Sequence, residues 1–315
     1  MKPKYRNALP QLSSKLFLTD AGLETELVFH DGMDLPLYES FILLKEQADR
    51  DRLHRYFADY AKLAAAKKVG LILETPTWRA NRDWAAQLGY DETEIATANR
   101  QAVELLCGVR DAYETTDAPV VISGCIGPRR DGYDPGAVLM TASEAEDYHL
   151  TQIRTFAETQ ADMVTVLTMN YVEEAIGVAR AAASADVPSV ISFTVETDGR
   201  LPTGQPLGEA VEAVDDASKG APAYFMINCA HPTHFADVLL TDEPWVKRLH
   251  GIRANASKLS HAELDECDTL DDGDPAELGR LYKNLLGRQS HINVVGGCCG
   301  TDYRHVEQIC HACAA

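Results

Sequence analysis

The sequence contains no apolar run near the about 18 residues that a membrane-spanning helix needs, so it predicts no membrane span. Basic residues are few: 29 Lys and Arg stand against 48 Asp and Glu, and the formal net charge is −19. Affinity for nucleic acid and for anionic membranes comes mostly from cations, so this balance argues against both partners. Residues 1–15 contain no apolar segment or small-residue cleavage site of a signal peptide, and we expect a cytoplasmic protein.

No Pro/Gly/Ser-rich linker, fixed-period repeat or low-complexity tract divides the 315 residues. The hydrophobic fraction of 45% and the charged fraction of 24% are ordinary for a globular protein with a sizeable core. We therefore expect one domain over residues 1–315. Eight cysteines in a chain of this length do not indicate a small disulfide scaffold. In a reducing compartment, clustered cysteines are more often metal ligands or catalytic groups.

Short apolar runs alternate along the chain with longer segments of helical spacing. The runs read as strands buried on both faces; they are 15–19, 69–74, 118–123, 162–168, 189–194, 223–228, 249–254 and 292–295. The predicted helices are 49–67, 92–113, 143–160, 172–183, 207–218, 275–286 and 303–313. Ser143 with Glu146 predicts a capping box, and Asp274 before Pro275 predicts an N-cap with proline at the first helical position. The acidic stretch 263–274 is interpreted as a solvated loop.

Eight predicted strands that alternate with helices indicate an α/β protein with a parallel sheet. Eight is the number of strands that closes a (β/α)8 (TIM) barrel, which is the predicted fold. A doubly wound open sheet is the alternative. In a barrel of this kind the active site lies at the C-terminal ends of the strands.

Three cysteines follow predicted strands and therefore meet at that end of the barrel. Cys229 comes directly after the sixth strand, and Cys298 and Cys299 follow the eighth. Three thiolates with one open position can form a catalytic zinc site. The flanking glycines would let the backbone bend so that both adjacent sulfurs face one ion. The alternative is that these cysteines are buried and inert, since free cysteine packs well.

The other five cysteines carry weaker signals. Cys107, Cys125 and Cys267 are interpreted as structural or incidental. Cys310 and Cys313 form a C-x-x-C pair in the last predicted helix, for which a redox or metal role is left open. That pair has no second ligand pair of the kind a structural zinc site requires.

Several motifs of this sequence resemble the homocysteine S-methyltransferase family, from about residue 18 to residue 306. Residues 18–27 (LTDAGLETEL) resemble its opening L-D-G-G-L-x-T-E-L, and residues 73–80 (LETPTWRA) resemble its T-x-T-Y-Q-A. Residues 192–194 (SFT) with 204–207 (GQPL) resemble its S-F-T…D-G-x-P-L. Residues 228–229 (NC) and 296–301 (GGCCGT) resemble its two zinc motifs, and the last is highly specific.

The resemblance implies a zinc-dependent (β/α)8 methyltransferase with Cys229, Cys298 and Cys299 as its zinc ligands and catalytic residues. The metal favours the thiolate form of a bound thiol, which then attacks a cationic methyl group of a sulfonium or quaternary ammonium donor. Homocysteine is the default acceptor, so methionine would form and the role would be methionine biosynthesis. The expected partners are thus a small-molecule thiol and a methyl donor, whose identity the sequence leaves open together with the oligomeric state.

The resemblance also suggests substrate contacts. Asp20 corresponds to the aspartate that helps hold the amino group of homocysteine, with a turn or helix cap as the alternative. Thr168 and Asn228 are expected at the substrate as well. Trp78 and Tyr171 could offer aromatic faces to the donor cation, or could simply pack at the rim.

The fourth strand departs from the family pattern F-E-T-I-P. Leu167 stands in place of the glutamate that contacts the substrate amine, and Asn170 in place of the proline. An ammonium held at Asp20 would lose a partner, which is costly for a buried charge. Glu74 and Glu196 could replace the missing glutamate as partners of the ammonium. Glu173 and Glu174 are instead expected to face solvent or cap the next helix.

Two further functions therefore stay open. One is methyl transfer to a different thiol or selenol that has no such amino group. The other is a catalytically inactive zinc-binding regulator.

Overall fold

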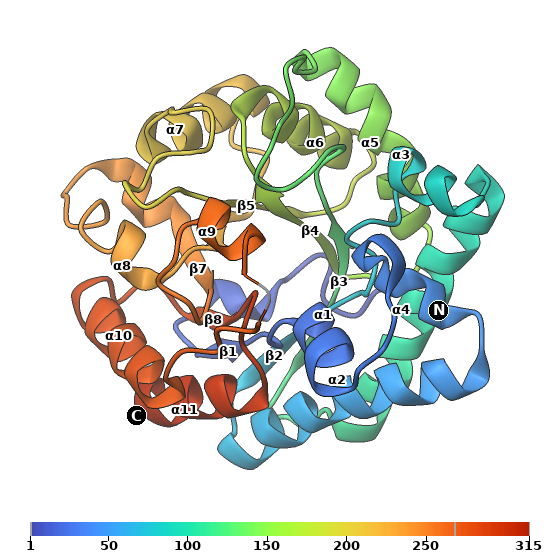
Figure 1. Cartoon of the computed structure of the whole chain (residues 1–315), viewed down its shortest axis with the longest axis horizontal. Helices are drawn as coiled ribbons and strands as arrows, with labels where there is room; N and C mark the ends of the chain where they lie inside the picture. The colour runs from blue at the N-terminus through green and yellow to red at the C-terminus, as the bar shows by residue number, and fades with distance from the viewer. Residues whose placement is uncertain (1, 268, 315) are drawn as a thin grey trace.

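The computed structural model describes residues 2–267 and 269–314. Eight parallel strands close into a barrel in chain order, and the last strand pairs with the first (Figure 1). This confirms the predicted (β/α)8 fold and excludes the open sheet. The strands are β1 (Phe17–Leu18), β2 (Gly70–Glu74), β3 (Val120–Ile126), β4 (Met163–Met169), β5 (Ser189–Phe193), β6 (Tyr224–Asn228), β7 (Leu249–Ala254) and β8 (Val294–Gly297).

Long helices surround the barrel, and short ones lie in the connections. The helices are α1 (Leu23–Thr25), α2 (Gln47–Lys67), α3 (Arg82–Ala85), α4 (Glu92–Tyr113), α5 (Ala142–Ala157), α6 (Val172–Ser184), α7 (Leu207–Ser218), α8 (Pro232–Phe235), α9 (His261–Asp265), α10 (Pro275–Arg288) and α11 (Tyr303–Cys313). A π-helix spans Glu26–His30, and 3-10 turns span Pro10–Leu12, Pro36–Tyr38, Ser40–Leu44, Ala86–Leu88 and Pro244–Arg248. None of the described helices is long and apolar enough to cross a membrane.

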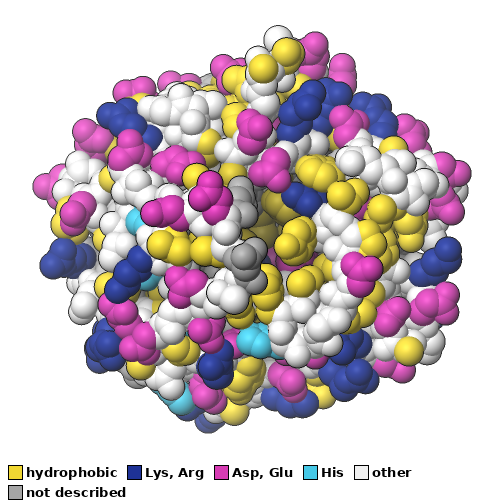
Figure 2. All heavy atoms as spheres, viewed as in Figure 1, with side chains coloured by type: hydrophobic (Ala, Val, Ile, Leu, Met, Phe, Trp, Pro, Cys, Tyr) yellow, Lys and Arg dark blue, Asp and Glu magenta, His cyan; other side chains and the backbone are white. Residues whose placement is uncertain are grey.

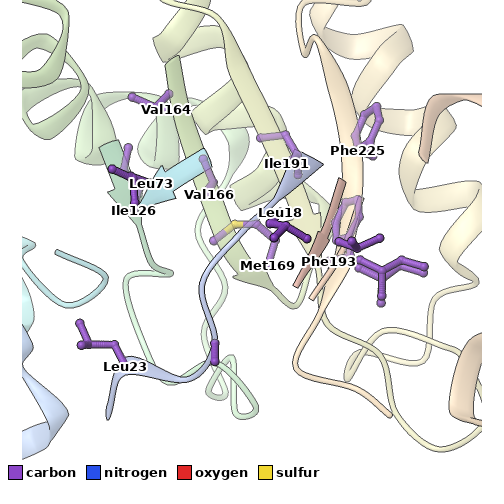
Figure 3. Close-up of a cluster of buried hydrophobic side chains, with 14 of the residues drawn as sticks. Leu18, Leu23, Leu73, Ile126, Val164, Val166, Met169, Ile191, Phe193 and Phe225 are labelled. Atoms are coloured by element: carbon purple, nitrogen blue, oxygen red, sulfur yellow. The ribbon is translucent and has the colours of Figure 1, made fainter. Parts of the chain in front are cut away.

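The apolar core has two parts, one on each side of the strands. Side chains that face outward pack against the helices, and Figure 3 shows Val166, Ile191 and Phe225 among them. A smaller cluster fills the barrel interior and includes Phe17 and Met163. Both faces of each strand are therefore buried, which explains why the strands read as continuous apolar runs.

The N-terminal segment covers one end of the barrel. The side-chain amide of Asn293 donates to the carbonyls of Gln11, Ser13 and Lys15, at 2.7–2.9 Å. Gln11 is buried with its amide 3.5 Å from the Tyr224 hydroxyl. The opposite end, where the strands finish, is thereby left for a site.

One predicted helix cap is wrong and one is confirmed. The N-cap of helix α5 is Thr141, two residues before the predicted Ser143: the Thr141 side chain accepts from the Glu144 N–H, and the Glu144 side chain accepts from the Thr141 N–H. Both pairs have the required spacing, so only the backbone path decides between them. Asp274 caps α10 as predicted, with Pro275 at the first helical position.

The acidic stretch 263–274 is more than a solvated loop, which corrects its interpretation. It includes part of α9, which lies over the centre of the barrel (Figure 1). Leu264, Leu270 and Asp271 line the pocket described below. Asp268 falls outside the described residues.

Candidate active site

A pocket of about 350 Å³ opens at the C-terminal ends of the strands. Hydrophobic side chains gather around the hollow at the centre of this face (Figure 2). All eight strands or the segments that follow them reach this end of the barrel, as in other parallel barrels. Among the predicted site residues, those that line the pocket are Asp20, Trp78, Thr168, Asn228, Cys229, Cys298 and Cys299.

The three predicted metal ligands converge in this pocket. The Cys229 sulfur lies 2.7 Å from the Cys298 sulfur and 3.4 Å from the Cys299 sulfur. Strand β7 helps to place two of them, because the Arg253 carbonyl accepts from the Cys229 N–H and the Ala254 carbonyl from the Cys298 N–H. Within residues 2–267 and 269–314, these three cysteines are the one group of three or more His, Cys, Asp or Glu side chains whose ligand atoms are close enough to hold one metal ion. Three soft sulfur donors on a partly open pocket are a donor set that suits zinc.

Glycines permit the close packing of the Cys298–Cys299 turn. A Cβ atom on Gly296 would collide with the Thr19 hydroxyl, and one on Gly297 with the Thr301 hydroxyl. Gly300 has a φ of +77°, in the left-handed region that other residues rarely adopt. The glycines therefore allow both close packing and the turn itself.

The thiols share one partly buried site and interact electrostatically. Hydrogen bonds from Cys229 and Cys299 hold the pKa of Cys298 well below its ordinary value, and the positive charge of Arg253 adds to the effect. Hydrogen bonding to Cys298 raises the pKa of Cys229 in turn. The cluster thus favours one thiolate that accepts from two thiols, and thiolates are the form that binds a metal.

Thr168 and Asn228 bind each other across the barrel mouth. The Asn228 side-chain oxygen accepts from the Thr168 N–H at 2.8 Å and from the Ser192 hydroxyl at 2.6 Å, and its nitrogen donates to the Thr168 hydroxyl at 2.9 Å. Thr168 has a φ of +64°, which is rare for a β-branched residue. Cys229 also has a positive φ, of +56°. Backbone strain of this kind persists where surrounding contacts hold it, and often at functional sites.

Tyr133 and His261 border the cysteines and were not predicted. The Tyr133 hydroxyl lies 3.6 Å from the Cys299 sulfur, and its ring stacks on His261 with centroids 3.8 Å apart. His261 Nε2 lies 2.6 Å from the Cys229 carbonyl oxygen, to which it donates. Both residues come from long connections, after β3 and β7, where no periodicity or motif marks them.

Asn170 has a structural role that its departure from the family pattern did not reveal. Its side-chain amide donates to the carbonyls of Asp131 and Gly132, at 2.9 and 3.0 Å. A Cβ on Gly132 would come within 2.6 Å of Thr168 Cγ2, so this segment packs closely on the end of β4. The contact fixes the backbone directly before Tyr133.

The two predicted aromatic contacts differ in position. Trp78 lines the pocket, and its indole N–H donates to the Leu167 carbonyl at 3.4 Å. Tyr171 lies instead against a smaller hollow beside the barrel, and its hydroxyl accepts from the Met140 N–H at 3.4 Å. Trp78 and Tyr171 are therefore not brought together.

The carboxylates near the fourth strand also differ from expectation. Glu174 neither faces solvent nor caps α6: it is buried and accepts from His149 Nε2 at 2.8 Å and the Arg129 N–H at 2.7 Å. Glu173 is exposed, as expected. Glu196 lies 3.3 Å from His261 Nδ1, outside the pocket lining. Glu74 does line the pocket, and burial raises its pKa to about 7 against the opposing charge of Arg253.

Asp20 is buried and already has a cationic partner. Its Oδ1 lies 2.8 Å from Nη2 of Arg253, and its Oδ2 accepts from the Tyr56 hydroxyl at 3.2 Å. Burial raises the pKa of Asp20, and the Arg253 guanidinium opposes that shift. Burial alone would lower the pKa of Arg253, but Asp20 and Cys298 raise it, so the guanidinium stays charged. Arg253 was not among the predicted site residues.

The remaining cysteines lie at different depths. Cys125 and Cys267 line the pocket, although both were interpreted as structural or incidental. Cys107 is buried in α4. Cys310 is buried and Cys313 half-buried in α11, and burial raises the pKa of both thiols, to about 11 and about 12.

Comparison with known proteins points to one family. The family described as homocysteine S-methyltransferase matches residues 17–313. A selenocysteine Se-methyltransferase of Brassica oleracea var. italica is 22% identical over 307 residues, which cover 90% of this chain and 85% of that protein. Homocysteine S-methyltransferase 2 of Arabidopsis thaliana is 21% identical over 307 residues, covering 90% and 88%.

A solved structure supports the same fold. The homocysteine methyltransferase MmuM of Escherichia coli, in its metallated form, superposes with a TM-score of 0.71 at 18% identity. The superposition covers 97% of this chain and 98% of that one.

Proposed function

This chain belongs to the homocysteine S-methyltransferase family, and we propose that it is a zinc-dependent enzyme that methylates a thiol or selenol. The donor we propose is a sulfonium or quaternary ammonium compound. The observation that carries the proposal is the convergence of the Cys229, Cys298 and Cys299 sulfurs in one pocket. Cys229, Cys298 and Cys299 would hold the ion, which when bound favours the thiolate form of the acceptor.

The reaction neutralises charge. The acceptor sulfur forms a bond to the methyl carbon while the bond from that carbon to the donor sulfur or nitrogen breaks. The bonding pair stays on the donor atom, which becomes neutral, and the acceptor's proton leaves to solvent. No strong general acid is then needed, and much of the acceleration comes from holding sulfur, methyl carbon and leaving atom in line.

Two aromatic side chains in the pocket suit the cationic donor. Trp78 lines one wall and Tyr133 lies beside the cysteines. Aromatic faces attract cations, more so where water is excluded. The stack of Tyr133 on His261 and the bond from Trp78 to Leu167 keep both rings in fixed orientations.

The first candidate acceptor is homocysteine, whose methylation gives methionine. Leu167, in the pocket wall, favours the second candidate, an acceptor without the amino group, because it is an apolar side chain that offers an ammonium no partner.

The proposal is tested by mass spectrometry of the products from a matrix of thiols and selenols against cationic methyl donors, together with metal analysis. Methylated product from at least one pair, with roughly one zinc per chain, is the expected result. Zinc-containing protein that methylates no acceptor with any donor would instead support an inactive zinc-binding homologue.

A further inference from the structure

The pocket beside the cysteines contains a buried cation that the proposed reaction does not yet use. Arg253, on β7, is 4% exposed and lines the pocket together with Cys229 and Cys298. Its Nε donates to the Gly297 carbonyl and its Nη2 to the Ala21 carbonyl, both at 3.1 Å. These bonds fix the plane of the guanidinium beside the thiols.

One nitrogen of this side chain has no partner. Arg253 Nη1 is buried and makes no hydrogen bond within residues 2–267 and 269–314. Buried donors are nearly always satisfied, and an unsatisfied donor on a charged group is especially costly. A carboxylate is the natural complement, because guanidinium binds it through charge-assisted hydrogen bonds.

The pocket carboxylates, by contrast, already face a cation or another partner. Asp20 forms an ion pair with Arg253 at 2.8 Å and accepts from the Tyr56 hydroxyl through Oδ2. Its Oδ1 and Glu74 Oε2 are buried without a hydrogen bond within the described residues, but both carboxylates face the charge of Arg253. On the rim, Asp131 is paired with Arg79 at 3.0 Å.

Two other carboxylates are bonded or partly neutral. Glu24 accepts from the Ser40 hydroxyl at 2.9 Å, and burial raises its pKa. The buried Glu74 has a pKa raised to about 7 and is partly protonated near neutrality. An ammonium placed near Asp20 would meet the positive charge of Arg253. Leu167, elsewhere in the pocket wall, would offer an ammonium no partner.

We propose that the acceptor is a thiol that carries a carboxylate and no amino group, and that Arg253 selects it by binding that carboxylate. This inference rests on the proposed function, since it names the acceptor class of the same site. Asp20 then serves to hold the guanidinium rather than to hold substrate. Arg253 is a specificity-determining residue, and Leu167 provides the wall where an amino group would otherwise sit.

The first test uses the wild-type protein with zinc and compares homocysteine with 4-mercaptobutyrate, the same thiol carboxylate without its amino group. We expect kcat/KM for 4-mercaptobutyrate to exceed that for homocysteine by about ten- to hundredfold, because both thiols offer Arg253 a carboxylate but only homocysteine would bury an ammonium without a partner. Calorimetric binding of the two thiols, without a methyl donor, should show the same preference. A preference for homocysteine in both measurements would overturn the inference.

The second test removes the positive charge at residue 253 in one variant and keeps it in another. In Arg253→Met, Asp20 loses its partner and is free for an ammonium, so the ratio of 4-mercaptobutyrate to homocysteine turnover should fall by at least tenfold. In Arg253→Lys, which keeps the charge but not the planar fork, the ratio should fall less. An unchanged ratio in Arg253→Met would contradict the assignment.

A fold control accompanies these variants. Because Arg253→Met leaves the Asp20 carboxylate buried and unpaired, the double variant Asp20→Asn/Arg253→Met removes the whole ion pair. It should bind 4-mercaptobutyrate at least tenfold more weakly than wild type by calorimetry, and unimpaired binding would overturn the inference. Failure of the proposed function looks different, because wild-type protein would then methylate no thiol while the calorimetric comparison still decides the preference.

Discussion

The Asn228 side chain binds Thr168 twice, accepting from its backbone N–H at 2.8 Å and donating to its hydroxyl at 2.9 Å. This pair joins the ends of β4 and β6, directly beside Cys229. It also holds Thr168 at a φ of +64°, which a β-branched residue adopts only under constraint. The position of one of the three pocket cysteines is therefore coupled to an otherwise unfavourable backbone conformation on another strand.

We expect Asn228→Ala to lower the free energy of unfolding by about 1–3 kcal/mol, because buried polar groups of Thr168 lose their partner. Turnover should fall at least tenfold as Cys229 shifts. In the Thr168→Gly background, where φ is unconstrained, the same substitution should cost less. Denaturant titrations of wild type, the two single variants and the double variant measure the coupling between the two positions. If the losses in the free energy of unfolding are strictly additive, the Asn228 side chain does not hold Thr168 in its strained conformation.

Cys298→Ala and Cys299→Ala should each lose most of the bound zinc without unfolding the barrel, because two thiolates bind the ion far more weakly than three. Metal content by mass spectrometry and circular dichroism of the reduced proteins provide the measurement. Cys107→Ala, in helix α4, is the matched control and should keep its metal. Full zinc in both site variants would rule out the ligand assignment.

Leu167→Glu should reduce turnover of 4-mercaptobutyrate by at least tenfold, since a carboxylate would then face the carboxylate of the acceptor in a low-dielectric pocket. Relative turnover of homocysteine should rise, because the new group offers its ammonium a partner. Leu167→Met keeps the apolar wall and serves as the control. If kcat/KM for 4-mercaptobutyrate is equal in the Glu and Met variants, Leu167 does not contact the acceptor.

Glu74→Gln should change the pH dependence of stability. Burial raises the pKa of Glu74 from 4.5 to about 7. Between these two pH values the folded state therefore holds a proton on Glu74 that the unfolded state has lost. The stability that protonated Glu74 contributes is fully present below its pKa in the unfolded state. It is lost as the pH rises through its pKa in the folded state.

The Gln variant has no buried carboxylate to ionise. Between pH 4.5 and pH 8 its free energy of unfolding should therefore rise by up to about 3 kcal/mol relative to that of wild type. Denaturant titrations at these two pH values measure the difference. Glu209→Gln, at an exposed position, is the control. A stability difference that stays constant with pH would show that folding does not raise the pKa of Glu74.

Local sequence patterns were sufficient to predict the barrel fold and the meeting of the three thiols at one end of it. Each strand is an apolar run whose length and flanking helices are visible within about 30 residues, so eight such units predict the closed sheet. Cys229 and the Gly-Gly-Cys-Cys-Gly turn follow strands directly, and parallel strands bring their C-terminal ends together whatever the details of packing. The ends of elements were less well predicted, as with Thr141 in place of Ser143, because two caps of equal quality compete and the backbone path decides.

Only the tertiary structure decided which groups surround the thiols. Arg253 and Asp20 are 233 residues apart in the chain and meet because β7 and β1 both border β8 in the closed barrel. Tyr133 and His261 lie in connections without periodicity, and Glu174 is buried because His149 on a neighbouring helix reaches it. The charge and partners of a side chain depend on distances through space. The sequence could therefore place Asp20 at the C-terminal end of the barrel, but it could not show that Asp20 forms an ion pair with Arg253.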